Sequence, residues 1–215
     1  MKKLAMAAAI GLISFPALAQ NMTVNAGRTT FGIRAGVNFQ NINGKNMDGG
    51  DLENHVLTGF NAGVNAEVPI GTGFYVQPGL LYSQKGAQSE NKVNKVHLSY
   101  VELPVNLVYK PILGSGNMVL GFGPYAALGV GGNVETNGNK TKVEFVSDYE
   151  PSTPAPQFKK FDAGANFLAG YEFVSRLSFQ LNAQLGLVNI NPEISTNDKS
   201  KLKNTGFGVS LGYRF

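Results

Sequence analysis

The sequence contains no cysteine and no tryptophan, and it has no long apolar run after its first 19 residues. Without cysteine, an exported chain has no disulfides, no thiolate chemistry and no lipid-modified N-terminal cysteine, so its stability must come from the fold alone. A membrane helix needs about 18 or more consecutive apolar residues, and 27 glycines disfavour long helices. If the chain enters a membrane, it must do so as strands.

The N-terminus has the pattern of a secretory signal peptide. Two lysines precede a short apolar run that contains one serine and one proline and ends in Ala17-Leu18-Ala19. We therefore expect cleavage after Ala19 rather than a retained anchor, with a signal peptide at residues 1–19 and one exported domain at residues 20–215. Removing the two lysines lowers the formal net charge from +4 to +2, which gives no reason to expect a nucleic-acid partner.

Most of the mature chain alternates between apolar residues and polar or small residues with a period of two. This pattern is typical of β-strands that keep one face in an apolar environment. In the first such segment, Phe31 and Ile33 alternate with Gly32 and Arg34. The eight segments that follow this rule are residues 31–40, 60–70, 74–85, 97–110, 120–130, 161–173, 177–187 and 207–215.

The connections between these segments alternate in length. The short ones are residues 71–73, 111–117 and 174–176, and the long ones are residues 41–57, 86–96, 131–160 and 191–203. Short turns at one end and long loops at the other are typical of outer-membrane barrels. We predict an all-β fold, an eight-stranded antiparallel up-and-down transmembrane β-barrel. Since an unpaired strand edge is costly in lipid, the strand at 31–42 should pair with the strand at 204–215.

The two faces of the predicted strands differ in a way that favours an apolar exterior. A soluble barrel would turn its apolar face inward. Here the apolar faces carry aromatic residues at strand ends, as an interfacial girdle does. These residues are Phe31, Phe39, Phe74, Tyr82, Tyr109, Phe173 and Phe215.

The polar faces combine glycine with charges that can pair. An eight-stranded lumen is just wide enough for side chains to fill it, and unpaired buried charges are costly. We therefore predict a structural ion network rather than a pore lining, and a barrel that does not conduct. The network comprises Arg34, Glu67, Lys85, Glu102, Asp162, Glu172 and Arg214.

One motif suggests a different function. Gly121-x-Gly123-x-x-Ala126 satisfies the pattern of a dinucleotide-binding turn. That turn needs a following helix, whereas here the alternation continues to Val130 and a polar, proline-bearing segment comes next. We interpret the segment as barrel wall and expect no cofactor.

Four segments together resemble the PorT-like outer membrane β-barrel proteins of Gram-negative bacteria. They are YVELPVNLVYK at 100–110, GFGPYAALGVGG at 121–132, FDAGANFLAGYEF at 161–173 and the terminal GVSLGYRF. The motif Tyr100-x-Glu102-x-Pro104 is the most specific part, and the resemblance covers essentially the whole mature chain. The resemblance implies a location in outer membrane lipid and insertion by the barrel-assembly machinery. The residues that resemble its C-terminal recognition signal are Leu211, Tyr213 and Phe215.

The residues available for chemistry give little support to an enzyme or a metal site. The two histidines, His55 and His97, would lie at the extracellular end. Ser99 shares the face of His97 but Glu102 points the opposite way, so no catalytic triad is predicted. The acidic residues of the first long loop are interpreted as hydrated rather than metal-binding.

These observations predict a monomeric integral outer membrane protein with a structural or surface-interaction role, neither enzymatic nor conducting. The loops at residues 41–57 and 131–160 are longer than closure needs, which favours an extracellular ligand. The segment PSTPAP at 151–156 favours extended, mobile backbone. The alternatives are a small porin, a barrel enzyme of the outer membrane, and a secretion-system accessory protein.

Overall fold

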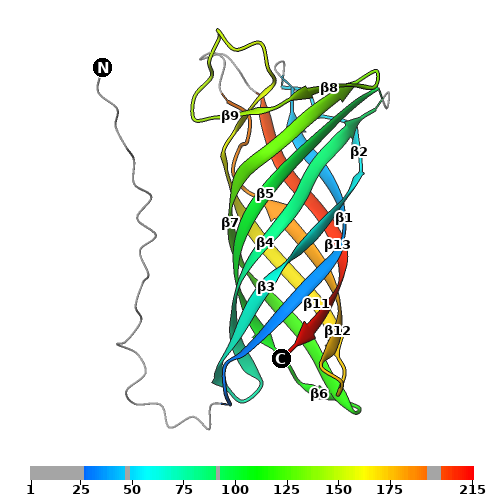
Figure 1. Ribbon diagram of the computed structural model, residues 1–215, viewed down its shortest axis with the longest axis vertical. Coiled ribbons are helices and arrows are strands. Elements are labelled where there is room, and N and C mark those ends of the chain that lie inside the picture. Colours follow the sequence, from blue (N-terminus) through cyan, green and yellow to red (C-terminus); the bar gives the residue numbers. More distant parts are fainter. Residues whose placement is uncertain (1–26, 47–48, 91–92, 193–199) are drawn as a thin grey trace, which may run out of the picture.

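The computed structural model describes residues 27–46, 49–90, 93–192 and 200–215, so the predicted signal peptide lies outside the described residues. Eight long strands dominate this part of the chain and slant across a tall cylinder (Figure 1). They are β1 (Thr30–Lys45), β3 (Leu57–Gly71), β4 (Phe74–Ser89), β5 (Asn94–Tyr109), β7 (Gly116–Thr136), β11 (Phe161–Glu172), β12 (Leu177–Gly186) and β13 (Lys201–Arg214). No helix long and apolar enough to cross a membrane occurs among the described residues.

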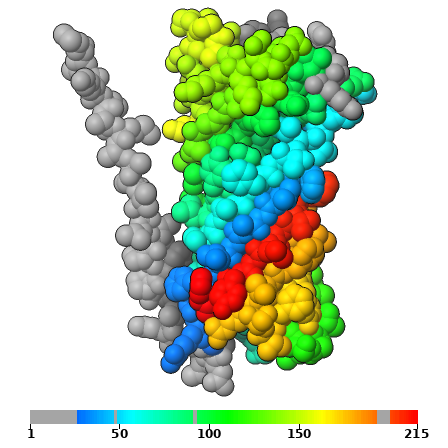
Figure 2. Space-filling view, turned by 45° about the vertical axis from the view of Figure 1, so that its right-hand side comes forward, coloured from blue at the N-terminus to red at the C-terminus, as the bar shows by residue number. Residues whose placement is uncertain are grey.

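The eight strands form one closed antiparallel barrel, which confirms the predicted fold. Each long strand pairs with the next in chain order, and the first pairs with the last. In that closing pair Ala35 lies opposite Leu211 and Lys45 opposite Lys201, and Figure 2 shows β1 in blue directly against β13 in red. Closure leaves no long strand edge in lipid, where each unpaired N–H or C=O group would cost several kcal/mol.

The strands extend further at one end than the alternation predicted. β1 reaches Lys45, β4 reaches Ser89 and β7 reaches Thr136, so parts of three predicted loops are strand. The apolar-polar alternation stops where a strand leaves its apolar surroundings, whereas backbone pairing continues into water. The sequence pattern therefore placed these strand ends too early.

Short strands complete the two ends of the barrel. β2 (Asn54–His55) pairs with β4, and β8 (Asn139–Lys142) pairs with β7. β9 (Glu144–Val146) and β10 (Gln157–Lys159) form a small parallel sheet. These elements lie at the top of Figure 1, whereas β6 (Ile112–Leu113) and the C-terminus lie at the bottom. The top is the end with the long loops, which is the extracellular end of such barrels, and the bottom is the periplasmic end.

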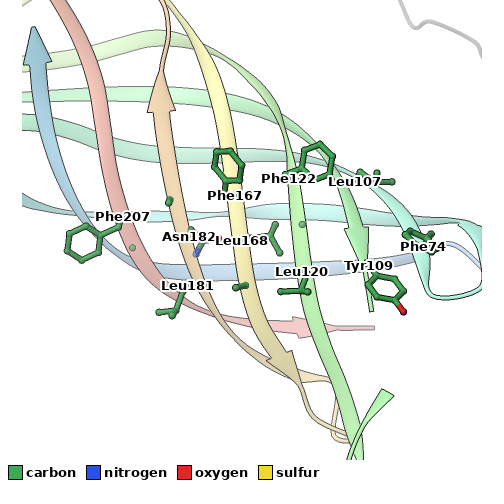
Figure 3. A pocket seen from close by; sticks show the side chains of 14 residues that line it. Phe74, Leu107, Tyr109, Leu120, Phe122, Phe167, Leu168, Leu181, Asn182 and Phe207 are labelled. Atoms are coloured by element: carbon green, nitrogen blue, oxygen red, sulfur yellow. The ribbon is translucent and has the colours of Figure 1, made fainter. Parts of the chain in front are cut away.

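The outer wall is covered with apolar side chains, as the sequence predicted. Phe122, Phe167, Leu181 and Phe207 are each more than half exposed. Figure 3 shows them on the neighbouring strands β7, β11, β12 and β13, where they border a groove of about 650 Å³. So many exposed large apolar side chains suit an exterior in hydrocarbon rather than in water.

Candidate functional site

The lumen is filled by side chains in layers, and the lowest layer, at the periplasmic end, is an ion cluster. Lys110 Nζ lies 2.7 Å from Glu67 Oε2 and 2.7 Å from Glu172 Oε2. Arg214 Nη2 lies 2.7 Å from Glu67 Oε1, and Arg214 Nε lies 3.7 Å from Glu172 Oε2. Gln77 Nε2 donates a hydrogen bond to Glu67 Oε1. Two cations and two carboxylates therefore balance each other in this periplasmic cluster.

An apolar group lies beside the periplasmic cluster in the lumen. It consists of Val108, Val119 and Leu168, all buried, with Tyr75 packed against them. These residues share the inward face with the charges because the strands continue their alternation past each charged position. The group packs directly on the periplasmic cluster, since Lys110 Nζ lies 5.5 Å from the centre of the Tyr75 ring.

The polar middle of the lumen is held by amide and hydroxyl groups. Arg34 Nη1 donates a hydrogen bond to Asn182 Oδ1 at 3.3 Å, and Asn182 Nδ2 donates to Ser210 Oγ at 2.8 Å. The cavity that remains between these side chains and Glu102 has a volume of about 20 Å³. That is room for about one water molecule.

A second ion cluster lies closer to the extracellular end. Lys85 Nζ lies 2.8 Å from Glu102 Oε1 and 3.1 Å from Asp162 Oδ2, and these side chains are between 0% and 2% exposed. Asn204 Nδ2 and Tyr125 Oη both donate hydrogen bonds to Asp162 Oδ2. The Lys85 ammonium also lies 4.2 Å from the centre of the Tyr125 ring, a favourable cation–π contact. This extracellular cluster contains one cation and two carboxylates.

An apolar cap closes the lumen at its extracellular end. Val143, Phe158 and Ile190 come from the long loops and are buried against strand residues, including Leu98. Phe145 packs against the same cluster, and a Cβ atom at Gly129 would overlap its ring. The loop at 131–160 is therefore not simply a solvated segment, because its apolar residues fold over the barrel mouth.

The structure brings six of the seven predicted network residues into two clusters. Glu67, Glu172 and Arg214 join the periplasmic cluster, and Lys85, Glu102 and Asp162 form the extracellular cluster. The seventh, Arg34, lines the small cavity beside Glu102 but hydrogen-bonds Asn182 instead.

Sequence reasoning missed Lys110, which is the centre of the periplasmic cluster. The alternation from Glu102 through Asn106 and Val108 places Lys110 on the inward face, so the signal was present in the sequence. Lys110 is the last residue of the predicted strand segment 97–110, but it was not counted among the predicted network charges. In the structure β5 ends at Tyr109, so the residue that follows a strand can still point into the lumen.

The two histidines lie on different strands of the described part of the chain and do not form a shared site. His55 lies on β2, whereas His97 lies on β5 together with Ser99, in an open cleft on the outer wall. Ser99 Oγ accepts a hydrogen bond from Tyr82 Oη at 2.8 Å. Among the residues that the structure describes, no group of three or more His, Asp, Glu or Cys side chains could hold a metal ion.

Several solved structures are similar to this barrel, each at low sequence identity. OprG from Pseudomonas aeruginosa has a TM-score of 0.50 and 13% identity, and the match covers 86% of this chain and 95% of that one. Neisserial surface protein A has a TM-score of 0.47 and 11% identity, with 88% and 100% covered. Ail, the attachment invasion locus protein of Yersinia pestis, has a TM-score of 0.45 and 12% identity, also with 88% and 100% covered. At these identities the likeness to OprG concerns the fold alone.

A comparison of sequences is more informative about the family. No curated protein matches the chain at a significant level. The family described as "Outer membrane protein beta-barrel domain" matches residues 18–191, which include seven of the eight long strands. Together with the closed barrel and its apolar exterior, this match shows that the chain belongs to the outer membrane protein beta-barrel domain family.

Proposed function

We propose that this protein is a monomeric, non-conducting and non-enzymatic barrel of the PorT-like type, with a structural or surface-interaction role. The observation that carries the proposal is the filled lumen. Two ion clusters, an apolar group and an apolar cap fill the interior of the barrel. An ion that crossed the barrel would have to displace paired charges and a hydrophobic seal, both of which oppose conduction.

Planar-bilayer recording tests the absence of conduction. The wild-type barrel should give no stable single-channel steps. A variant with Lys85→Ser and Asp162→Ser should serve as a control, because it removes one buried cation and one buried carboxylate and keeps Glu102 beside Arg34. Steps from this control would show that the barrel inserts, and stable large steps from the wild type would favour the porin alternative.

The final strand supports a second part of the proposal, insertion by the barrel-assembly machinery. Leu211, Tyr213 and Phe215 are exposed on the outer face, and the Tyr213 and Phe215 rings lie 5.4 Å apart. Phe215 N donates a hydrogen bond to Phe31 O across the closing seam. Deleting Phe215 should lower the amount of heat-modifiable, folded protein in the outer membrane. Unchanged folded protein would remove the assembly role from this residue.

The surface-interaction role rests on the extracellular loops at 41–57 and 131–160. A test that deleted residues 133–158 would also remove the lumen cap, because Val143 and Phe158 lie within them. Asp148→Asn with Glu150→Gln changes exposed positions only and leaves the cap in place. Surface capture of a partner that is lost in this variant favours a binding role, whereas no partner in either chain favours a structural one.

A barrel esterase is the second candidate function, because His97 and Ser99 line the same outward cleft. Glu135 lies close enough to His97 to act on its charge. Release of fatty acid from an ester lipid, abolished by Ser99→Ala, would favour the esterase. The hydrogen bond that Ser99 accepts from Tyr82 occupies its oxygen without activating it, which is why we rank this candidate second.

A further inference from the structure

An open cleft of about 360 Å³ lies on the outer wall near the extracellular ends of β4, β5 and β7. These three strands, with β8, rise to the top of the barrel in Figure 1. The exposed side chains of Tyr82 and Val130 line the cleft, so it lies outside the lumen, and it shares no residue with either ion cluster. Its lining residues are Tyr82, Gln84, His97, Ser99, Val130, Gly131, Gly132, Asn133 and Lys140.

The cleft lies where the outer wall changes from apolar to polar. On β4 the outward side chains change from Tyr82 to Gln84, and on β5 they change from Val101 to Ser99. The strand register puts these changes at one height, because Tyr82 lies opposite Val101 and Gln84 opposite Ser99. Tyrosine is enriched at membrane–water interfaces, so this height corresponds to the lipid headgroups.

The charges around the cleft are mostly positive. Lys95, Lys140 and Glu135 are the charged groups that act on His97, and Lys142 lies opposite Asn133 in the β7–β8 pair. Lys140 Nζ is 3.8 Å from Glu135 Oε2 but remains 65% exposed, so it is available to an anion. Three lysines against one glutamate favour a negatively charged occupant.

A glycine keeps the floor of the cleft open. The β5–β7 register shifts between Ser99 and Tyr100, opposite Gly131 and Gly129. A Cβ atom at Gly131 would meet no atom within 4 Å, and its φ lies outside the left-handed region, so neither packing nor backbone requires glycine there. The absence of a side chain at Gly131 leaves the space that a ligand would fill.

We propose that this cleft binds a phosphorylated lipid of the outer leaflet. Lys140 and its neighbouring lysines would hold the phosphate, and the acyl chains would run down the apolar wall below Tyr82 and Val130. A lipid fits better than a soluble protein because the lower half of the cleft borders hydrocarbon. The proposal rests on the membrane location and does not depend on whether the lumen is closed.

Native mass spectrometry of the purified barrel in detergent tests the proposal. The probes are a bisphosphorylated lipid A, its dephosphorylated counterpart and phosphatidylcholine. We expect the wild type to retain the bisphosphorylated lipid in preference to the other two. Equal retention of all three lipids would overturn the proposal.

Variants separate the cleft from general attraction to anionic lipid. Lys140→Gln with Lys142→Gln should weaken retention by about fivefold or more, since each basic residue near an anionic surface contributes measurably. Gly131→Leu should weaken it by roughly tenfold by filling the cleft without changing charge. Lys201→Gln, at the extracellular end of β13, removes a charge elsewhere and should have no effect.

The folding of each variant is checked by heat-modifiable migration. If Gly131→Leu fails to fold, the comparison between the double lysine variant and Lys201→Gln decides whether the cleft binds the lipid. An equal loss of the bisphosphorylated lipid per lysine removed in the double lysine variant and in Lys201→Gln would mean that only net charge matters, and would refute the site.

Discussion

The two ion clusters of the lumen compensate their buried carboxylates in different ways. The periplasmic cluster pairs two cations with two carboxylates and lies near the barrel mouth, where Glu172 is 16% and Arg214 11% exposed. The extracellular cluster has one cation for two carboxylates, and its side chains are at most 2% exposed. The extracellular cluster therefore has fewer ion pairs than the periplasmic cluster, and it is more deeply buried.

The difference teaches that neutral donors can replace a missing cation in a buried cluster. Asp162 receives hydrogen bonds from Asn204 and Tyr125 as well as its ion pair with Lys85, and Gln184 Nε2 donates to Glu102 Oε2. Such donors favour the charged form of a carboxylate without adding net charge. The extracellular cluster should therefore depend on Lys85 more than the periplasmic cluster depends on either of its cations.

Replacing Lys85 should have the largest effect. Lys85→Met leaves Asp162 buried without a cation and Glu102 with only the nearby Arg34, which should reduce the free energy of unfolding in a bilayer by about 3–5 kcal/mol. Reversible urea unfolding in lipid vesicles measures this loss of free energy. Adding Glu102→Gln and Asp162→Asn should recover much of the loss. No recovery in this triple variant would show that packing, and not charge, sets the cost.

A charge on the lipid-facing side of the wall has no group of opposite charge to pair with, in contrast to a charge in the lumen. Val105 faces outward near mid-membrane, and Val105→Arg should cost about 2–4 kcal/mol in the same unfolding experiment. Its neighbour Asn106 is buried in the lumen, and Asn106→Ser should cost much less. Equal costs at the two positions would mean that the inward and outward faces are wrongly assigned.

Replacing Lys110 should have a smaller effect than replacing Lys85. After Lys110→Met, Glu67 keeps its 2.7 Å contact with Arg214, and Glu172 is near water. We expect a loss of about 1.5–3 kcal/mol, the range for hydrogen bonds to charged groups. A loss equal to that of Lys85→Met would show that the two clusters do not differ as their burial indicates.

An exposed pair should have the smallest effect. Lys140 and Glu135 form an ion pair at 3.8 Å outside the lumen, and Lys140 is 65% exposed. Lys140→Gln should change the free energy of unfolding by less than about 0.5 kcal/mol. A larger loss would mean that this residue supports the β7–β8 hairpin rather than a ligand.

Much of the barrel wall was predictable, because lipid requires apolar outward side chains and paired backbone groups in each strand. Residues such as Phe31 and Leu211 had to face outward, and the first strand had to pair with the last. The ends of the barrel were less predictable. Strand pairing continues beyond Gln84 and Val130, where the outward face is no longer apolar and inward residues such as Ala87 and Val134 pack in the lumen cap, so the alternation no longer reports it.

The lumen cap was not predictable from the local pattern. Val143, Phe145 and Phe158 lie among polar and charged residues, and no periodicity marks them as buried. Their burial depends on residues far away in the chain, such as Leu98 and Ile190. Only a closed barrel brings these residues to a common mouth.

The sequence by itself determined the number of strands, their inward and outward faces and the set of charges that had to share one interior. Those features follow from a period of two and from the cost of exposing polar backbone to hydrocarbon. Only the tertiary structure decided which charges pair and that a loop seals the mouth. Pairing depends on the stagger between strands around a closed circle, and no single strand carries that information.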